Sequence, residues 1–226
     1  MRRARVALLL AGALCACGVP AAAQTAARPQ RLPSLELGGG VTWAGSFTGP
    51  SRAAELTRNE QAAGGFDLFR FSGEVTNGPG LGAWIGYHVT RTIAVEGGFR
   101  FSKPELAYRL SGDAENAPDA TATETLSRYA ITGSVVLHLR RVDGRRFVPF
   151  VAAGGGYIRD LHELHELLET GHEYHGLAGI KYWLGSGRRR FGIRAQAGVT
   201  VTSGGFDFRD DSRTVPIAAA GVVYLF

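Results

Sequence analysis

Alternation between apolar and polar or small residues is the feature that most limits what this chain can fold into. In residues 191–202 the odd positions carry Phe, Ile, Ala, Ala, Val and Val, and the even positions carry Gly, Arg, Gln, Gly, Thr and Thr. Successive side chains of a β-strand point to opposite faces, so this period of two predicts strands with one apolar and one polar face. Similar segments predict eight strands, with an ambiguous phase in the fifth: 34–47, 80–89, 92–102, 127–139, 147–158, 174–184, 191–202 and 216–226.

The lengths of these strands and of their connections indicate a membrane barrel. Each strand has roughly ten residues or more, enough to cross the hydrocarbon core of a bilayer at a tilt. Long connections alternate with short ones, which is typical of outer-membrane barrels; the long segments are 48–79, 103–121 and 159–173, the short ones 90–91, 140–146 and 185–190, and 203–215 is intermediate. We therefore predict an all-β fold, a single eight-stranded antiparallel up-and-down transmembrane β-barrel over residues 34–226.

Alternation alone does not say which face points inward. The apolar face is dominated by bulky residues, whereas the polar face contains many of the 32 glycines. Inside a narrow barrel, glycine makes room for long charged side chains, so we expect the polar face to line the lumen. Aromatic residues near the strand ends are then candidates for two interfacial girdles, Trp43, Phe47, Phe99, Phe101 and Tyr129 at one level and Tyr87, Tyr182, Phe191 and Phe226 at the other.

The N-terminus has the pattern of a secretion signal. Three early arginines precede an apolar run over residues 6–16, and small residues at Ala21 and Ala23 predict cleavage before Gln24. The run is too short for a membrane-spanning helix. We predict a signal peptide over residues 1–23 and a periplasmic lead-in over residues 24–33. Two alternatives stay open: an uncleaved anchor, and a lipoprotein signal with Cys17 lipidated.

Cleavage of this signal changes the charge and the cysteine content. The whole sequence has a formal net charge of +5, and loss of three arginines leaves +2. The basic balance therefore gives no support to nucleic-acid binding. Both cysteines, Cys15 and Cys17, are lost as well, so the mature chain has no disulfide and no thiolate metal site.

The chain resembles the small outer-membrane β-barrel families, those of outer-membrane proteins A, X and W. The resemblance rests on residues 148–157 (VPFVAAGGGY) and on the closing residues 222–226 (VVYLF). It implies that Val222, Tyr224 and Phe226 form the assembly signal read by the barrel-insertion machinery. It also implies an integral outer-membrane protein surrounded by outer-membrane lipids, with no nucleic-acid partner and a monomeric state.

The polar face carries charges that must be accommodated in the lumen. Within a few residues of the short-turn end it holds Glu36, Glu96, Lys181 and Arg194, and toward the long loops it holds Arg100, Arg128 and Glu124. An unpaired charge in a low-dielectric interior is unfavourable. We expect the first four residues to form a cross-barrel ion-pair network that closes the lumen.

Residues 159–173 and the start of the next strand hold four of the six histidines. These are His162, His165, His172 and His175, and on a short amphipathic helix the first two would share a face and could hold a divalent metal. The spacing is not that of a zinc protease, and the histidines can equally form the wet side of this helix. We regard them as weak candidates and predict no metal and no cofactor.

Catalysis needs a nucleophile, a base and an orienting group in one place, and no motif for such a site is present. The serines that could serve lie outside any nucleophile motif: Ser102, Ser127, Ser134, Ser203 and Ser212. We predict a non-enzymatic barrel with a structural or surface-interaction role. The alternatives are a narrow porin-like transporter or a binder of small, hydrophobic molecules, followed by an outer-membrane lipid-modifying enzyme.

Overall fold

The computed structural model describes residues 35–49, 51–55, 67–114, 117–140, 146–162, 168–184, 190–204 and 212–226. The predicted signal peptide and lead-in lie outside these residues, as does Cys17. Residues 32–226 form one compact unit. No helix in the described part of the chain is both long and apolar enough to cross a membrane.

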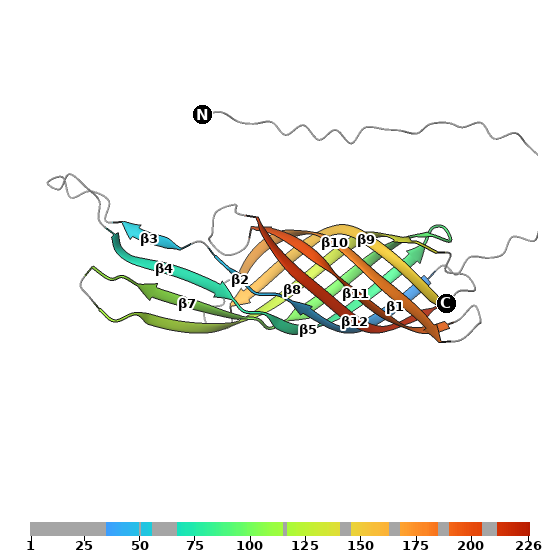
Figure 1. Ribbon diagram of the computed structural model, residues 1–226, viewed down its shortest axis with the longest axis horizontal. Coiled ribbons are helices and arrows are strands. Elements are labelled where there is room, and N and C mark those ends of the chain that lie inside the picture. The colour runs from blue at the N-terminus through green and yellow to red at the C-terminus, as the bar shows by residue number, and fades with distance from the viewer. Residues whose placement is uncertain are drawn as a thin grey trace, which may run out of the picture. The chain divides into compact units, whose positions relative to one another are not determined.

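Eight strands close into a barrel, as predicted (Figure 1). They are β1 (Leu35–Ala44), β5 (Gly78–His88), β6 (Ile93–Ser102), β8 (Ala120–His138), β9 (Phe147–His162), β10 (Leu168–Leu184), β11 (Arg190–Gly204) and β12 (Arg213–Leu225). Each pairs antiparallel with its neighbour in this order, and β12 pairs with β1 to complete the ring. Because every strand has two neighbours, the barrel has no open edge.

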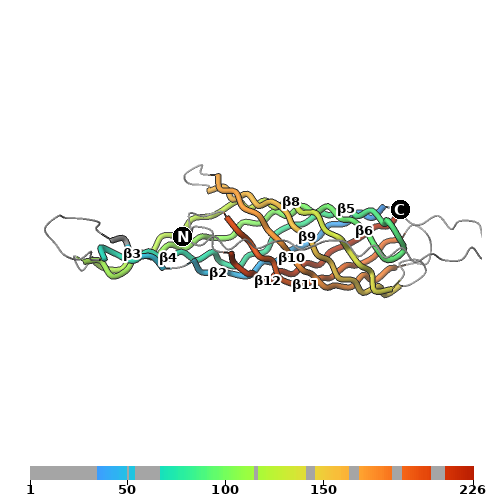
Figure 2. Tube along the Cα trace, turned by 90° about the horizontal axis from the view of Figure 1, so that it is seen from above, coloured from blue at the N-terminus to red at the C-terminus, as the bar shows by residue number. Residues whose placement is uncertain are grey.

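The two ends of the barrel differ. At one end a tight turn over residues 89–92 joins β5 to β6, and Phe226 donates a backbone hydrogen bond to Leu35 O at 2.9 Å. We call this the turn end. At the opposite end, the loop end, the sheet continues beyond the barrel wall (Figure 2).

This continuation differs from the predicted loops. Residues 47–79 and 103–121 contain additional strands, namely β2 (Phe47–Thr48), β3 (Arg52–Glu55), β4 (Asp67–Val75) and β7 (Glu105–Ser111). They form a second sheet with residues 120–125 of β8, and we call this sheet the protruding sheet. Its strands form because their apolar residues also alternate, for example Leu106, Tyr108 and Leu110 in β7.

The orientation of the faces agrees with the glycine argument. Large apolar side chains cover the outside of the barrel, such as Leu81 and Ile131, which are 63% and 65% exposed. The lumen instead holds buried polar and charged side chains, among them Glu36, Lys181 and Arg194. A soluble barrel would show the reverse arrangement, so the described exterior is suited to lipid rather than to water.

One of the predicted girdle residues is misplaced. Phe47 does not face outward; it packs against the buried cluster of Val75, Leu106 and Leu126. Strand β1 ends at Ala44, and Phe47 belongs to the next strand, β2, where it pairs with Val75 of β4. The guanidinium groups of Arg128 and Arg213 lie 5.8 and 5.0 Å from the Phe47 ring.

Glycines on the inner face make room for large rings as much as for charged chains. A Cβ at Gly38 would meet Trp84 Nε1 at 2.2 Å, and one at Gly179 would meet the Phe150 ring at 2.6 Å. Both rings lie in the lumen and are buried. The glycines therefore set which aromatic side chains the narrow lumen can hold.

We expect Gly38→Ala to destabilise the barrel by about 1–3 kcal/mol, because the new methyl group overpacks the lumen against Trp84. Gly176→Ala is the matched control, since a Cβ there meets nothing within 4 Å. Urea unfolding of the two variants in lipid vesicles, followed by gel mobility, measures the difference. Equal stability of the two variants would contradict this packing role of Gly38.

Candidate functional site

A network of buried charges crosses the lumen near the turn end. Lys181 Nζ, from β10, donates to Glu36 Oε1 and Oε2 of β1 at 2.7 and 2.8 Å. Only 1% of either residue is exposed. The two strands lie three apart in the ring, so this ion pair spans the lumen rather than one wall.

A second ion pair lies beside the first. Arg194 of β11 donates from Nη1 and Nη2 to the two carboxylate oxygens of Glu96 on β6, at 2.5 and 2.9 Å. These strands are four apart in a ring of eight, so the guanidinium and the carboxylate come from opposite walls. Arg194 Nη1 also lies 3.9 Å from Glu36 Oε1, which links the two pairs. The structure thus brings Glu36, Glu96, Lys181 and Arg194 together.

Two aromatic rings and an amide hold the Arg194 guanidinium in place. Its central carbon lies 4.9 Å from the centroid of the Trp84 ring and 4.8 Å from that of Phe150. Its Nε donates to Gln196 Oε1 at 2.9 Å. Cation–π contacts of this kind are strongest where water is excluded, as it is here. The lumen-facing positions of Trp84 and Phe150 therefore belong to the network.

Sequence reasoning missed two histidines of this network. His88 Nε2 lies 3.3 Å from Glu36 Oε2, and Lys181 Nζ donates to His138 Nε2 at 3.1 Å. The two imidazole rings stack with centroids 5.1 Å apart. Both histidines end a strand at the turn end and lie on its polar face, which is the signal that could have found them. We call these six residues, Glu36, His88, Glu96, His138, Lys181 and Arg194, the charged floor.

An apolar layer lies between the charged floor and the turn end. It consists of Val148, Trp183, Val223 and Leu225, each no more than 1% exposed, and we call it the apolar seal. Trp183 is two residues closer to the turn end than Lys181 on the same strand. The Arg190 guanidinium lies over the Trp183 ring, with its central carbon 5.3 Å from the ring centroid. Charge and hydrocarbon therefore fill successive layers of the lumen.

The other predicted charges form separate pairs toward the loop end. Both terminal carboxylate oxygens of Glu173 accept hydrogen bonds from Arg100 Nη2 across the lumen. Arg128 binds Asp160, its partner on the adjacent strand, through Nε at 2.7 Å and Nη2 at 2.8 Å. Arg100 thus pairs with Glu173 and Arg128 with Asp160, and neither arginine contacts the charged floor directly.

Among the described residues, cavities follow one another from the charged floor toward the loop end. The innermost, of about 60 Å³, is lined by Trp84, Glu96 and Arg100 among others. The next, of about 50 Å³, shares Arg100 and extends to Phe47 and Arg128. The outermost, of about 20 Å³, shares Phe47 and Arg128. We call this series the vestibule; each cavity has room for a few waters at most.

The described parts of the histidine-rich segment are strand rather than helix. Strand β9 runs to His162 and β10 starts at Leu168, and residues 163–167 lie outside the described residues. His162 contacts Glu124 Oε2 at 3.1 Å, His175 contacts Ser134 at 2.8 Å, and His172 faces outward against Tyr157. His165 lies outside the described residues. The three described histidines have different partners and two different faces, so they do not form one metal site.

Ser134 is a candidate nucleophile of the lumen, because it forms a hydrogen bond with a histidine. Its Oγ lies 2.8 Å from His175 Nε2, but the nearest oxygen of Glu173 is 3.9 Å from His175 Nδ1. That distance exceeds a hydrogen bond, since Arg100 holds the Glu173 carboxylate. The histidine therefore lacks the orienting contact of a catalytic base. The absence of enzymatic activity stays a prediction.

The residues of the predicted assembly signal lie on the strand that closes the ring. Val222 and Phe226 face outward, and Tyr224 packs its ring against that of Phe226 at 4.7 Å. Strand β12 pairs with β1 from Ile217 to Leu225. Closure of the barrel thus depends on this strand, while its recognition by the insertion machinery stays a prediction.

Comparison of structures finds similar folds among small outer-membrane barrels. The outer membrane protein OprG from Pseudomonas aeruginosa matches with a TM-score of 0.52 and 11% identity, over 87% of this chain and 99% of that chain. Neisserial surface protein A matches with a TM-score of 0.46 and 14% identity, over 86% and 97%. The N-terminal β-barrel domain of Pseudomonas aeruginosa OprF matches with a TM-score of 0.42 and 14% identity, over 86% and 98%.

No protein-family model and no curated protein sequence matches the chain. At 11% identity the similarity to OprG shows the fold alone. The chain therefore has the eight-stranded fold of a small outer-membrane barrel, as the resemblance implied.

We expect Arg194→Ala to destabilise the barrel by about 3–5 kcal/mol, because it leaves Glu96 in the lumen without its partner. Arg109→Ala is the control. It removes an exposed ion pair with Asp119, in which the side chains are 64% and 45% exposed, so it should change stability by about 0–1 kcal/mol. Denaturant unfolding in lipid vesicles measures both, and a loss below 1 kcal/mol for Arg194→Ala would contradict the cross-barrel role of this pair.

Proposed function

We propose that this chain is an outer-membrane barrel with a closed lumen, and that it acts through the protruding sheet in a surface-interaction or structural role. The observation that carries the proposal is the charged floor, whose ion pairs join opposite walls of the lumen. A protein built to pass solutes would leave that path open. The fold it shares with OprG supports the membrane location.

The outer surface supports insertion in a membrane. Its exposed side chains include a large set of apolar residues distributed over all eight barrel strands. Aromatic side chains lie outward at both ends, with Trp43 and Tyr129 toward the loop end and Tyr87 and Tyr182 toward the turn end. Such rings are favoured at the two membrane interfaces. In this proposal the turn end, which holds both ends of the barrel sequence, faces the periplasm.

The lumen supports a closed state rather than a pore. An eight-stranded barrel is only wide enough for side chains to fill. Here the charged floor and the apolar seal occupy successive layers, and Arg194 is packed between aromatic rings. Water and ions would have to cross both layers to reach the turn end.

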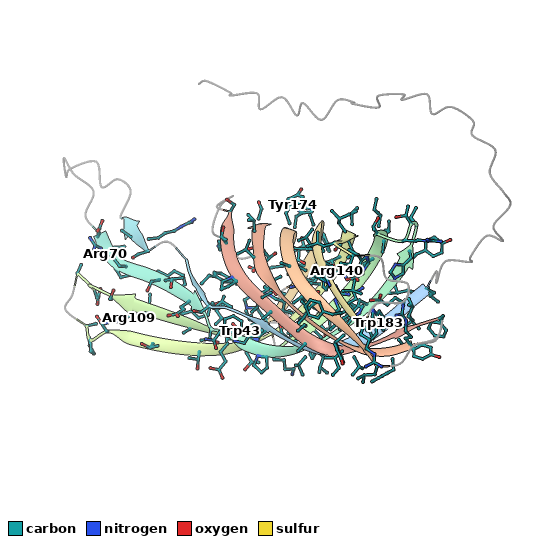
Figure 3. The ribbon with its side chains drawn as sticks, turned by 45° about the vertical axis from the view of Figure 1, so that its right-hand side comes forward. Trp43, Arg70, Arg109, Arg140, Tyr174 and Trp183 are labelled. Carbon is teal, nitrogen blue, oxygen red and sulfur yellow. The ribbon has the colours of Figure 1, made fainter. Side chains whose placement is uncertain are left out.

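The protruding sheet supports a role at the outer surface. Arg70 and Arg109 lie on it, at the opposite end of the molecule from Trp183 (Figure 3). At its base Val75, Leu106 and Leu126 form an apolar cluster that joins the sheet to the barrel mouth. This packing holds the sheet as a continuation of the barrel wall, so it can present side chains in a fixed arrangement.

A second candidate function is supported by the vestibule. A chain of cavities that ends on Trp84, Glu96 and Arg100 could hold a small molecule that enters from the loop end. Its volume is far below that of ordinary drug-sized pockets, which span about 300–1,000 Å³. Saturable binding of a small ligand, abolished by filling the vestibule with Ala130→Trp, would favour this candidate.

We expect Val199→Arg to destabilise the membrane-inserted barrel by about 2–4 kcal/mol, because Val199 faces outward and a charge at mid-membrane depth is unfavourable. Thr200→Arg is the control. Thr200 is buried in the lumen and lines the same cavity as Glu173, so a new guanidinium there has a carboxylate nearby. Unfolding of the two variants in vesicles measures the effect. If Thr200→Arg were the more damaging change, the barrel would be better described as a soluble one.

We expect the wild-type protein to show no steady conductance in a planar bilayer, because the charged floor and the apolar seal close the lumen. Lys181→Ala combined with Trp183→Ala should introduce conducting events, since it removes one large side chain from each layer. Leu184→Ala, which alters the outer face of the same strand, is the control. Steady wild-type conductance would overturn the closed-lumen proposal and favour the transporter.

A further inference from the structure

The charged floor contains a set of side chains that matches a transition-metal site. Glu36, His88 and His138 each offer one ligand atom, and these atoms lie within 4.8 Å of one another. All three side chains are buried. Two imidazoles and one carboxylate are a ligand set that proteins use for Zn²⁺.

The distances already approach those of a bound ion. Ligand atoms at about 2.0–2.2 Å from a tetrahedral zinc lie roughly 3.3–3.6 Å from one another. His88 Nε2 and Glu36 Oε2 are 3.3 Å apart, so one edge of such a site is present. The other ligand-atom separations are at most 4.8 Å, so His138 has to approach by no more than about 1.5 Å to complete the site.

Lys181 contacts two of the three ligands. Its ammonium group lies 2.7 and 2.8 Å from the oxygens of Glu36 and 3.1 Å from His138 Nε2. The group therefore supplies the positive charge between the carboxylate and the imidazole. A metal ion would use the same oxygen and nitrogen lone pairs, so the ion and the ammonium cannot occupy the position together.

We propose that Glu36, His88 and His138 bind a divalent transition-metal ion such as Zn²⁺ in the lumen, in competition with the ammonium group of Lys181. Mg²⁺ and Ca²⁺ prefer oxygen donors and do not fit this site, since two of its three donor atoms are imidazole nitrogens. Arg194, 3.9 Å from Glu36, would remain beside the carboxylate and orient it. The bound ion would tie β1, β5 and β8 together across the lumen.

The site is closed toward both ends of the barrel, so a metal ion has to be added before the barrel folds as well as after. The apolar seal lies toward the turn end, and the Arg194–Glu96 pair lies between the site and the vestibule. The experiment therefore adds the ion in two arms, before refolding of the barrel into vesicles and after it. The chain is prepared without a histidine tag, because a tag would bind the same ions.

The probe is Co²⁺, whose visible absorption reports tetrahedral nitrogen and oxygen ligands, and total bound Zn²⁺ is counted after gel filtration. We expect one ion per wild-type barrel when the metal is present during refolding. His88→Ala and His138→Ala should each lower the affinity by at least about tenfold. Lys181→Leu should raise it by about tenfold or more, because the competing ammonium is gone.

His175→Ala is the matched control, since it removes a buried lumen histidine that contacts Ser134 and lies outside this set. It should bind Co²⁺ as the wild type does. Gel mobility before and after heating checks that every variant has folded. Because the comparison of His88→Ala and His138→Ala with His175→Ala tests the site, the experiment is decided even where Lys181→Leu does not fold.

Absence of a bound ion in both arms for the wild-type barrel would overturn the proposal. It would be overturned equally by binding that persists in His88→Ala and His138→Ala, or by binding that is lost in the His175→Ala control. An affinity unchanged by Lys181→Leu, in a folded variant, would overturn the competition with the ammonium. None of these results bears on whether the lumen conducts.

Discussion

Every charge enclosed by this barrel must have a partner inside it, because the lumen is too narrow to hold bulk water. In the charged floor that requirement is met across the lumen, from β1 to β10 and from β6 to β11. Such pairs hold opposite walls at a fixed separation, and they do so only if all partners lie at the same level. Three features keep the partners at one level of the lumen. They are the register of the strands, the positions of the inner glycines and the aromatic rings beside Arg194.

Much of this arrangement could be predicted because a barrel strand has only two faces. Once a residue is assigned to the polar face, its distance from the turn end sets its level in the lumen. That reasoning placed Glu36, Glu96, Lys181 and Arg194 at one level, and the structure shows them in contact. The same reasoning applied to His88 and His138 would have added them. Four of the six histidines are concentrated in residues 162–175, whereas His88 and His138 stand alone at the ends of their strands, where no motif marks them.

The remaining differences arise where local pattern does not decide the structure. The strands of the protruding sheet alternate as barrel strands do, but their place depends on pairing with the long strand β8. Phe47 faces inward because it belongs to β2, which pairs with β4 of the protruding sheet, and no periodicity indicates that β1 ends before it. The histidine-rich segment has an amphipathic helical pattern, yet its described residues, up to His162 and from Leu168 on, belong to the paired strands β9 and β10. In each case tertiary pairing overrode a local preference.

Strand β8 belongs to both parts of the molecule. Its first six residues complete the protruding sheet, and its last residue, His138, reaches the charged floor. A mechanical load applied to the protruding sheet would therefore be carried along the axis of β8. In this direction the hydrogen bonds to β6 and β9 resist together, in shear, instead of breaking one after another as in peeling. The protruding sheet is thus anchored through all the hydrogen bonds that β8 makes along the height of the barrel wall.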